Sequence, residues 1–203
     1  MEPLFLPAPE DIALLEPFER LALDRITLVA EAGDAERAAN TLLGAPAWGF
    51  DTESRPTFQA GQASEGPHVV QLATLDHAFV FQLHDPRCRD VVGELLRQPQ
   101  AVKAGFGLRD DRRRIVDKLG VEPRQVLDLD TVFRQRGYRR QMGVKAAVAV
   151  LFGRRFLKSK RAATSNWAQR RLSDSQLLYA ANDAWAALRV YQALGSPPGP
   201  EPS

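Results

Sequence analysis

Two acidic side chains stand two residues apart in the stretch Ala47-Trp48-Gly49-Phe50-Asp51-Thr52-Glu53-Ser54. Residues two apart in an extended strand point to the same face, so Asp51 and Glu53 are expected to project together from a strand whose other face is apolar. Carboxylates this close repel each other, and a cation between them removes the conflict. Mg²⁺ is bound by such pairs together with water and substrate phosphates. The alternative is two solvated acids at a strand end.

A third acid, Asp183, falls within a helix predicted over residues 173–194. Helical spacing places it in a mostly apolar row, one turn after Tyr179, whereas Asn182 and Arg189 are expected to face water. A buried carboxylate needs a partner, and a cation is the strongest one available. A capping role or an arginine partner is the alternative.

Two further acids, Asp110 and Asp111, follow an apolar run and the turn Gly105-Phe106-Gly107 at the start of a predicted helix. The third glycine of a dinucleotide-binding turn is absent. Acids at a helix N-terminus interact favourably with the helix dipole, which is the structural alternative for both. Only one of the two can readily face the sheet.

The elements that must position these acids form a mixed pattern. Three strands with short links are predicted at 48–54, 68–75 and 78–83, which indicates an antiparallel meander. The other predicted strands cover 26–30, 101–106 and 126–133, and the predicted helices cover 9–23, 34–43, 91–97, 108–119, 144–152 and 173–194. This order predicts an α/β fold, a mixed β-sheet flanked by α-helices. Residues 1–23 are expected to be an N-terminal extension, 24–194 the functional domain and 195–203 a disordered tail.

Composition places the chain among ordinary soluble domains, with 44% hydrophobic and 26% charged residues. It has no apolar run long enough for a membrane span and no evident signal peptide, and its single Cys88 excludes an intrachain disulfide, so a cytoplasmic setting without a membrane partner is expected. Charge is uneven, because residues 1–100 carry 7 Lys/Arg against 16 Asp/Glu and residues 101–203 carry 20 against 9. A basic half is typical of a nucleic-acid contact surface, although chance scatter remains the alternative.

The acidic motifs together resemble a known family. Phe50-Asp51-Thr52-Glu53, then Lys103 followed by Asp111 eight residues later, and then Tyr179 followed by Asp183 are similar to the three exonuclease motifs of the DEDDy 3′-to-5′ exonucleases, the ribonuclease D and Werner-exonuclease branch. The stretch 157–184 is especially similar to the Werner-type domain. The likeness covers about residues 24–194. It implies a ribonuclease H-like (DnaQ-like exonuclease) fold.

The resemblance also implies a mechanism. It is that of a metal-dependent 3′-to-5′ exonuclease releasing 5′-mononucleotides with two divalent ions, Mg²⁺ or Mn²⁺. By likeness, Asp51 bridges the ions or binds the first, with Glu53 and Asp183 beside it, and Asp111 holds the second mainly through water. Tyr179 is expected to orient the attacking water, since a phenol with an ordinary pKa near 10 suits positioning better than full proton abstraction.

The strand itself is expected to be held by basic and aromatic side chains. Candidate substrate-binding residues are Lys103, Lys158, Lys160, Arg161 and Trp167. Lysine and arginine neutralise phosphates, and a tryptophan can stack on a base, although it is as often part of a core.

Several alternatives stay open on the sequence. A catalytically silent nucleic-acid-binding module of the same fold is one, and an oligoribonuclease restricted to very short RNAs is another. The sequence does not distinguish DNA from RNA, because that choice depends on contacts to a 2′-hydroxyl. The partner expected is a single-stranded or 3′-ended nucleic acid. The chain is expected to act alone, as a homo-oligomer, or with a processivity partner, and the sequence leaves these three alternatives open.

Overall fold

A computed structural model describes residues 4–56 and 65–200 of the chain. Its strands are β1 (Ile26–Val29), β2 (Ala47–Glu53), β3 (Val69–Ala73), β4 (Ala78–Gln82), β5 (Val102–Gly105) and β6 (Val126–Asp128). Its α-helices are α1 (Pro9–Leu14), α2 (Ala32–Leu43), α3 (Pro86–Arg97), α4 (Arg109–Leu119), α5 (Leu129–Gln135), α6 (Val144–Phe152), α7 (Lys160–Ala163) and α8 (Asp174–Ala193).

The six strands form one mixed sheet in the order β1-β4-β3-β2-β5-β6. β2, β3 and β4 are antiparallel neighbours, which confirms the predicted meander, and β1, β5 and β6 join in parallel. Parallel neighbours need crossover connections, and α2, α3 and α4 supply helices for them. The predicted mixed sheet flanked by helices is confirmed.

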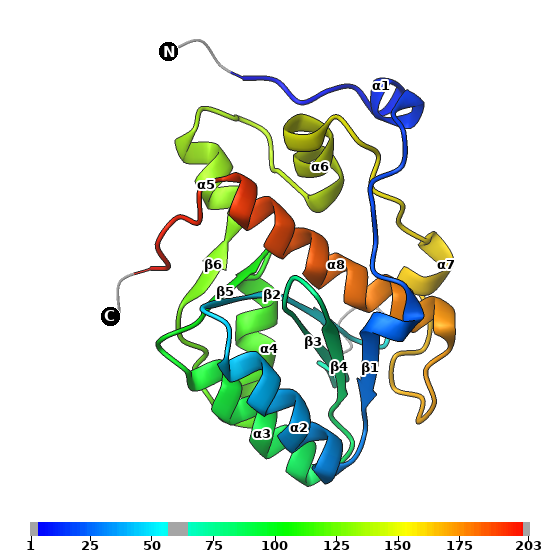
Figure 1. Ribbon diagram of the computed structural model, residues 1–203, viewed down its shortest axis with the longest axis vertical. Helices are drawn as coiled ribbons and strands as arrows, with labels where there is room; N and C mark the ends of the chain where they lie inside the picture. The colour runs from blue at the N-terminus through cyan, green and yellow to red at the C-terminus, as the bar shows by residue number, and fades with distance from the viewer. Residues whose placement is uncertain (1–3, 57–64, 201–203) are drawn as a thin grey trace.

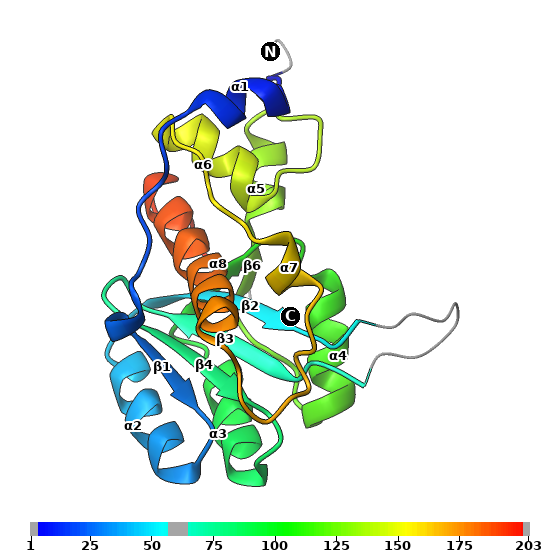
Figure 2. The same ribbon diagram turned by 90° about the vertical axis from the view of Figure 1, so that its right-hand side faces the viewer.

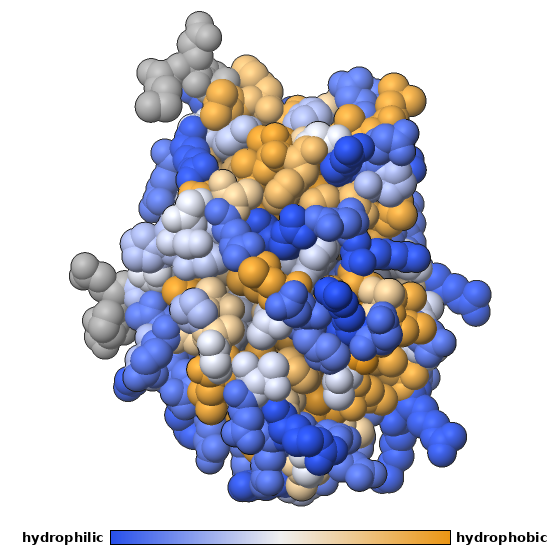
Figure 3. All heavy atoms as spheres, viewed as in Figure 1, coloured by the Kyte–Doolittle hydropathy of each residue, from blue (hydrophilic) through white to orange (hydrophobic). Residues whose placement is uncertain are grey.

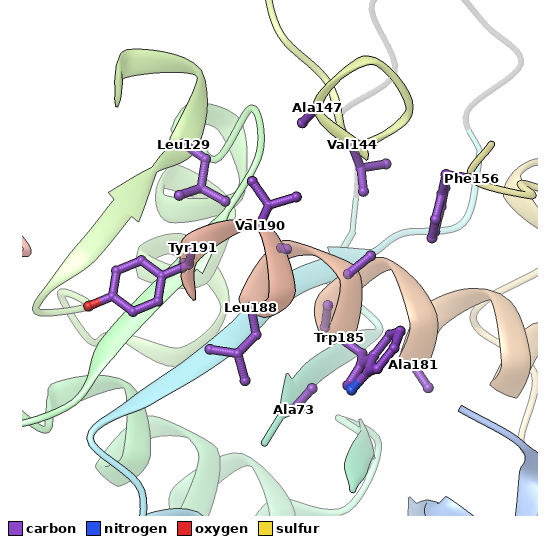
Figure 4. Packing of buried hydrophobic residues seen from close by; sticks show 14 of the residues in the cluster. Ala73, Leu129, Val144, Ala147, Phe156, Ala181, Trp185, Leu188, Val190 and Tyr191 are labelled. Carbon is purple, nitrogen blue, oxygen red and sulfur yellow. The ribbon is translucent and has the colours of Figure 1, made fainter. Parts of the chain in front are cut away.

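Helices cover both faces of the sheet (Figures 1 and 2). α2, α3 and α4 pack on one face, over a core that includes Trp48 and Phe50 of β2. α8 crosses the other face diagonally, and α5 and α6 lie beyond it. Side chains from the sheet, α6 and α8 interlock around this helix (Figure 4). β2 therefore lies at the centre of the molecule with one helical layer on each side.

The N-terminal segment differs from its prediction. The helix expected over residues 9–23 ends at Leu14, because the residue before a proline disfavours helical backbone and Pro17 follows soon after. Residues 15–22 instead run extended along α8, where Phe18 and Leu21 are buried. Asn182, expected to face water, is buried there: it accepts from the Leu21 backbone N–H (2.7 Å) and donates to the Leu21 carbonyl (3.1 Å).

The strand predicted over residues 126–133 is also shorter than expected. It stops at Asp128, whose carboxylate accepts a hydrogen bond from the backbone N–H of Asp130 at 3.1 Å and so caps α5. Residues 57–64, between β2 and β3, lie outside the described residues, as do 201–203 of the tail. The disorder expected for the tail stays a prediction.

Candidate active site

Asp51 and Glu53 lie on the α8 face of β2, as their spacing predicts. Their antiparallel partners on β3 are Gln71 for Asp51 and Val69 for Glu53. Thr52, between them, points the other way. Its backbone N–H donates to Asp51 Oδ1 at 2.9 Å. The two acids therefore stand side by side beneath the helix that crosses the sheet.

Asp183 reaches this pair because α8 lies unusually close to β2. A Cβ at Gly49 would come 1.8 Å from the Ala184 carbonyl oxygen, so only glycine allows this approach. One carboxylate oxygen from each of Asp51, Glu53 and Asp183 lies within 4.8 Å of the other two. Asp183 is buried and the other two are half-buried. Three acids from two elements thus form a single cluster.

Asp111, near the start of α4, lines one cavity together with these three acids. The Thr52 hydroxyl donates a hydrogen bond to Asp111 Oδ1. Gly107, with a φ of +68°, makes the turn into α4. Asp110 is exposed and pairs with Arg113 at 3.5 Å, on a different side of α4. The cavity, of about 450 Å³, is lined by Asp51, Glu53, Asp111, Lys158 and Asp183, with Phe106 and Met142 among its apolar residues.

Burial and mutual repulsion raise the pKa values of these carboxyls. The pKa of Asp51 rises well above its ordinary value through burial and then through Asp183 and Asp111. Burial and the Asp51 charge raise the pKa of Glu53 to about 9. Burial likewise raises the pKa of Asp111 and of Asp183. Such shifts indicate a cluster that is unfavourable without a positive charge.

Lys158 supplies one positive charge. Its Nζ lies 2.5 Å from Asp183 Oδ2 and 4.9 Å from the centre of the Tyr179 ring. Burial alone would lower the pKa of Lys158, but the Asp183 carboxylate reverses the direction and raises it. Burial, and then Asp183, raise the pKa of the Tyr179 phenol. Both groups are therefore protonated at neutral pH, and both can act as hydrogen-bond donors.

The carboxylates fit a divalent cation. Within the described chain, neither oxygen of the buried Asp183 carboxylate accepts a well-formed hydrogen bond, and the Lys158 ammonium makes an ionic contact with Oδ2. Clustered carboxylate oxygens are the donors that Mg²⁺ and Mn²⁺ prefer. Asp51, Glu53 and Asp183 are thus the residues that would hold such an ion, with Asp111 across the same cavity.

The substrate-binding role predicted for Lys103 and Trp167 is wrong, because both side chains are buried. Lys103 is 0% exposed: its Nζ donates to the Gln98 carbonyl and lies 5.1 Å from the Trp48 ring centre. Trp167 is also 0% exposed, packed 5.9 Å from the Tyr179 ring, so neither can touch a nucleic-acid strand. Their positions next to motif residues suggested contact, but both side chains turn into the core. Lys160 and Arg161 are exposed on α7, and their contact with substrate stays a prediction.

Two acids that support the cavity were missed because they lie inside the predicted 126–133 strand. The Asp128 carboxylate accepts the backbone N–H groups of Gly107 (3.1 Å) and Leu108 (3.0 Å), which holds the turn before α4. Asp130 is buried, accepts the Met142 N–H at 2.6 Å and pairs with Arg134 at 2.7 Å. The spacing Asp-x-Asp directly after an apolar strand was the available signal. It resembles that of Asp51 and Glu53, but the two acids serve as supports.

A second cavity, of about 360 Å³, adjoins the first. The N-terminal segment forms one wall through Phe18 and Arg20, and Lys158, Tyr179 and Asp183 form part of another. Lys158 and Asp183 line both cavities. The site is therefore open on two sides of these residues.

Comparison with known proteins identifies the class. Residues 26–196 match the family model of the 3′-5′ exonuclease domain. The chain therefore belongs to the 3′-5′ exonuclease family, and the resemblance predicted from its motifs is confirmed. The N-terminal segment before residue 26 lies outside the matched region.

Particular relatives agree with this assignment. The chain is 30% identical over 171 residues to a ribonuclease D of Granulibacter bethesdensis, covering 83% of this chain and 42% of that protein. It is 28% identical over 148 residues to a 3′-5′ exonuclease of Arabidopsis thaliana, covering 72% and 51%. The chain thus spans about half the length, or less, of these relatives.

Solved structures show the same fold. Trypanosoma brucei ribonuclease D superimposes with a TM-score of 0.75 at 24% identity, covering 83% of this chain and 64% of that one. The exonuclease domain of Aedes aegypti Nibbler gives 0.72 at 23% identity, covering 87% and 89%. The ribonuclease H-like fold is therefore confirmed.

Proposed function

We propose that this protein is a metal-dependent 3′-to-5′ exonuclease that hydrolyses phosphodiester bonds of DNA or RNA and releases 5′-mononucleotides. The observation that carries the proposal is the convergence of Asp51, Glu53, Asp111 and Asp183 on one cavity, with Tyr179 one helical turn from Asp183. These acids come from β2, α4 and α8, and no single element could supply this arrangement. Membership of the 3′-5′ exonuclease family supports the same reaction.

The carboxylates are proposed to hold two divalent ions, Mg²⁺ or Mn²⁺. When bound, such a pair stabilises the negative charge that develops on the attacking and leaving oxygens of a phosphodiester. Asp51, Glu53 and Asp183 are assigned to one ion, and Asp111 to the other. Asp111 remains hydrogen-bonded to the Thr52 hydroxyl, so its carboxylate has a defined orientation toward the cavity.

Tyr179 and Lys158 are assigned to positioning. The protonated Tyr179 phenol can donate a hydrogen bond that orients a water molecule beside the scissile phosphate. The Lys158 ammonium, held at the edge of the cluster by Asp183, can bind a phosphate oxygen. Apolar residues of the cavity, such as Phe106 and Met142, offer a surface for a base or sugar.

Nucleic acid is the proposed substrate class, and RNA is the first substrate to test. The structure of T. brucei ribonuclease D that resembles this chain has also been solved in complex with RNA U12. Exposed basic residues near the cavity, Lys160 and Arg161 on α7, are proposed to contact the phosphates of the strand.

A time course on 5′-labelled single-stranded RNA and DNA tests the proposal, with Mg²⁺, Mn²⁺ or EDTA. A metal-dependent ladder that shortens from the 3′ end is expected, and Asp51→Asn should abolish it because a metal ligand loses its charge without a change of shape. Asp111→Asn should lower the rate at least 100-fold. Its neighbour Asp110→Asn is the matched control and should cleave like the wild type, since Asp110 is exposed and paired with Arg113.

Cleavage that persists in EDTA, or in Asp51→Asn, would refute the metal-dependent mechanism. Intact substrate in every lane, together with a gel shift, would instead favour a catalytically silent binding module.

A further inference from the structure

Gln71 is a buried polar residue that the proposed reaction does not use. It lies in the middle of β3 and is 0% exposed. Neither its amide nitrogen nor its amide oxygen has a hydrogen-bond partner in the part of the chain that the structure describes. A buried amide without partners is costly, and native proteins rarely keep one without a reason. A Leu at this position of the sheet would avoid the cost.

The sheet register places Gln71 directly beside the acidic cluster. It pairs across the antiparallel ladder with Asp51 on β2, so the two side chains leave the same face of the sheet with their Cβ atoms about 4.5–5.5 Å apart. On the other side of β3, its ladder partner on β4 is the apolar Val80. On β2, Glu53 is its diagonal neighbour. Its nearest polar neighbours across β2 are thus the acids of the active site.

Asp51 has unused capacity to accept hydrogen bonds. The one protein hydrogen bond to its carboxylate in the described structure is from the Thr52 backbone N–H, to Oδ1. An ionised carboxylate has about four lone-pair positions, whereas a glutamine amide offers two N–H donors. A donor on the carboxylate fixes its rotation and leaves the remaining lone pairs aimed at a cation.

We propose that Gln71 is a positioning residue for the metal site: when a divalent cation binds, its Nε2, which has no partner among the described residues, donates to the Asp51 carboxylate and orients it toward the cation. This inference rests on the proposed function, because it assigns Asp51 as a metal ligand. It explains why a polar side chain occupies an otherwise apolar row formed with Val69 and Ala73 on this face of β3.

Gln82 on β4 provides a matched comparison. It is a glutamine on the same face of the same sheet, one strand further from Asp51, and it is also buried. Its Nε2 donates to the Gln169 carbonyl at 2.9 Å, which ties β4 to the segment before α8. Gln82 therefore has a structural partner, whereas Gln71 has none among the described residues and stands opposite Asp51.

The test compares Gln71→Leu, Gln82→Leu, Asp51→Asn and the wild type. Mn²⁺ binding is measured by calorimetry without nucleic acid, and thermal unfolding is measured in EDTA. Gln71→Leu should weaken Mn²⁺ binding about 10- to 100-fold, as expected for loss of an outer partner of a ligand. Its unfolding midpoint in EDTA should be unchanged or higher, because an unpartnered amide has been replaced by an apolar group.

Gln82→Leu should show the reverse pattern, a lower midpoint with Mn²⁺ affinity within about twofold of wild type, because it loses a structural hydrogen bond. Gln71→Met, which keeps the length of the side chain without its donors, repeats the measurement if the leucine variant does not fold. Wild-type Mn²⁺ affinity in Gln71→Leu or Gln71→Met would overturn the inference and leave the proposed function intact. Failure of the wild type to bind Mn²⁺ would instead contradict the proposed function.

Discussion

The surroundings of Glu53 in the active site disfavour its ionised carboxylate. Its carboxyl is half-buried beside Asp51 and Asp183, and its pKa rises from the ordinary value of 4.5 to about 9. At neutral pH the metal-free protein must therefore either keep this proton or bear repulsion between carboxylates. Such a cluster disfavours the metal-free fold and favours binding of cations, since a cation removes the repulsion.

The stability of the metal-free protein should therefore depend on pH. Between about pH 4.5 and 9 the folded state holds a proton on Glu53 that the unfolded state has released, so the free energy of unfolding should fall as pH rises, by about 1.4 kcal/mol per pH unit for one proton. Thermal unfolding in EDTA from pH 5 to 9 measures this slope.

Glu53→Gln is the control for that measurement, because it removes the titrating group but keeps its shape. The free energy of unfolding of this variant should fall less steeply with pH than that of the wild type, by about 1.4 kcal/mol per pH unit. Equal slopes in the two proteins would mean that Glu53 does not titrate in this window. Saturating Mn²⁺ should raise the wild-type midpoint most at high pH, where the carboxylates are free of protons.

At the scale of elements, the site depends on how closely α8 lies over β2. α8 is buried on nearly all sides, with the sheet on one side and α6 and the N-terminal segment on the other (Figure 2). A helix with apolar side chains all round is expected to be central rather than superficial. The small residues Gly49 and Ala184 meet at the crossing. This close approach is what brings Asp183 down to Asp51 and Glu53.

Gly49→Ala should therefore disrupt both stability and the site. The new methyl group would meet the Ala184 backbone oxygen at 1.8 Å, and backbone cannot move aside as a flexible side chain can. We expect a loss of more than about 3 kcal/mol in the free energy of unfolding, or no folded protein at all. Chemical denaturation measures the change.

The matched substitution is Gly33→Ala in α2, where the added methyl group has only an ordinary contact with the Arg37 side chain at 3.6 Å. An alanine in place of a helical glycine should stabilise the protein by about 0.5–1 kcal/mol. A wild-type stability for Gly49→Ala would show that α8 and β2 can separate without cost, contrary to the packing described here.

At the scale of the whole molecule, charge is distributed unevenly. The residues from 101 onward, which are richer in Lys and Arg, include α7 and the segment carrying Lys158. Hydrophilic side chains cover much of the face seen in Figure 3, with apolar areas between them. No helix within residues 4–56 or 65–200 has both the length and the apolar character needed to cross a bilayer. Phosphate binding at the basic part of the surface would make affinity for nucleic acid depend on salt.

Removing two of these charges should reduce that dependence. In the Asp51→Asn background, which prevents cleavage, a double variant Lys160→Gln/Arg161→Gln is expected to lower the slope of log K against log salt concentration by about 1.4 for single-stranded RNA, if both side chains contact phosphates. Fluorescence anisotropy over a series of salt concentrations measures the slope.

Arg37→Gln/Arg87→Gln is the control with the same change of net charge. These arginines lie on α2 and α3, on the far face of the sheet, so their removal should leave the slope unchanged. Equal salt slopes for the Lys160/Arg161 variant and this control would indicate that the nucleic acid binds away from α7.

Much of the fold and of the acidic site could be predicted from short-range patterns. Alternation along a strand places Asp51 and Glu53 on one face, and helical spacing places Tyr179 one turn from Asp183. These relations depend on residues two to four apart, whose geometry is set by the local backbone. The order of the motifs was enough to predict the family, which the family model confirms.

Tertiary packing decided the rest, because the environment of a side chain depends on segments that are distant in sequence. Lys103 and Trp167 turned out to be buried, and Asn182 is covered by the N-terminal segment that was expected to be helical. The support given by Asp128 to the turn before α4 involves residues about 20 positions away. The pairing of Gln71 with Asp51 likewise joins residues 20 positions apart, through a strand register that local periodicity does not specify.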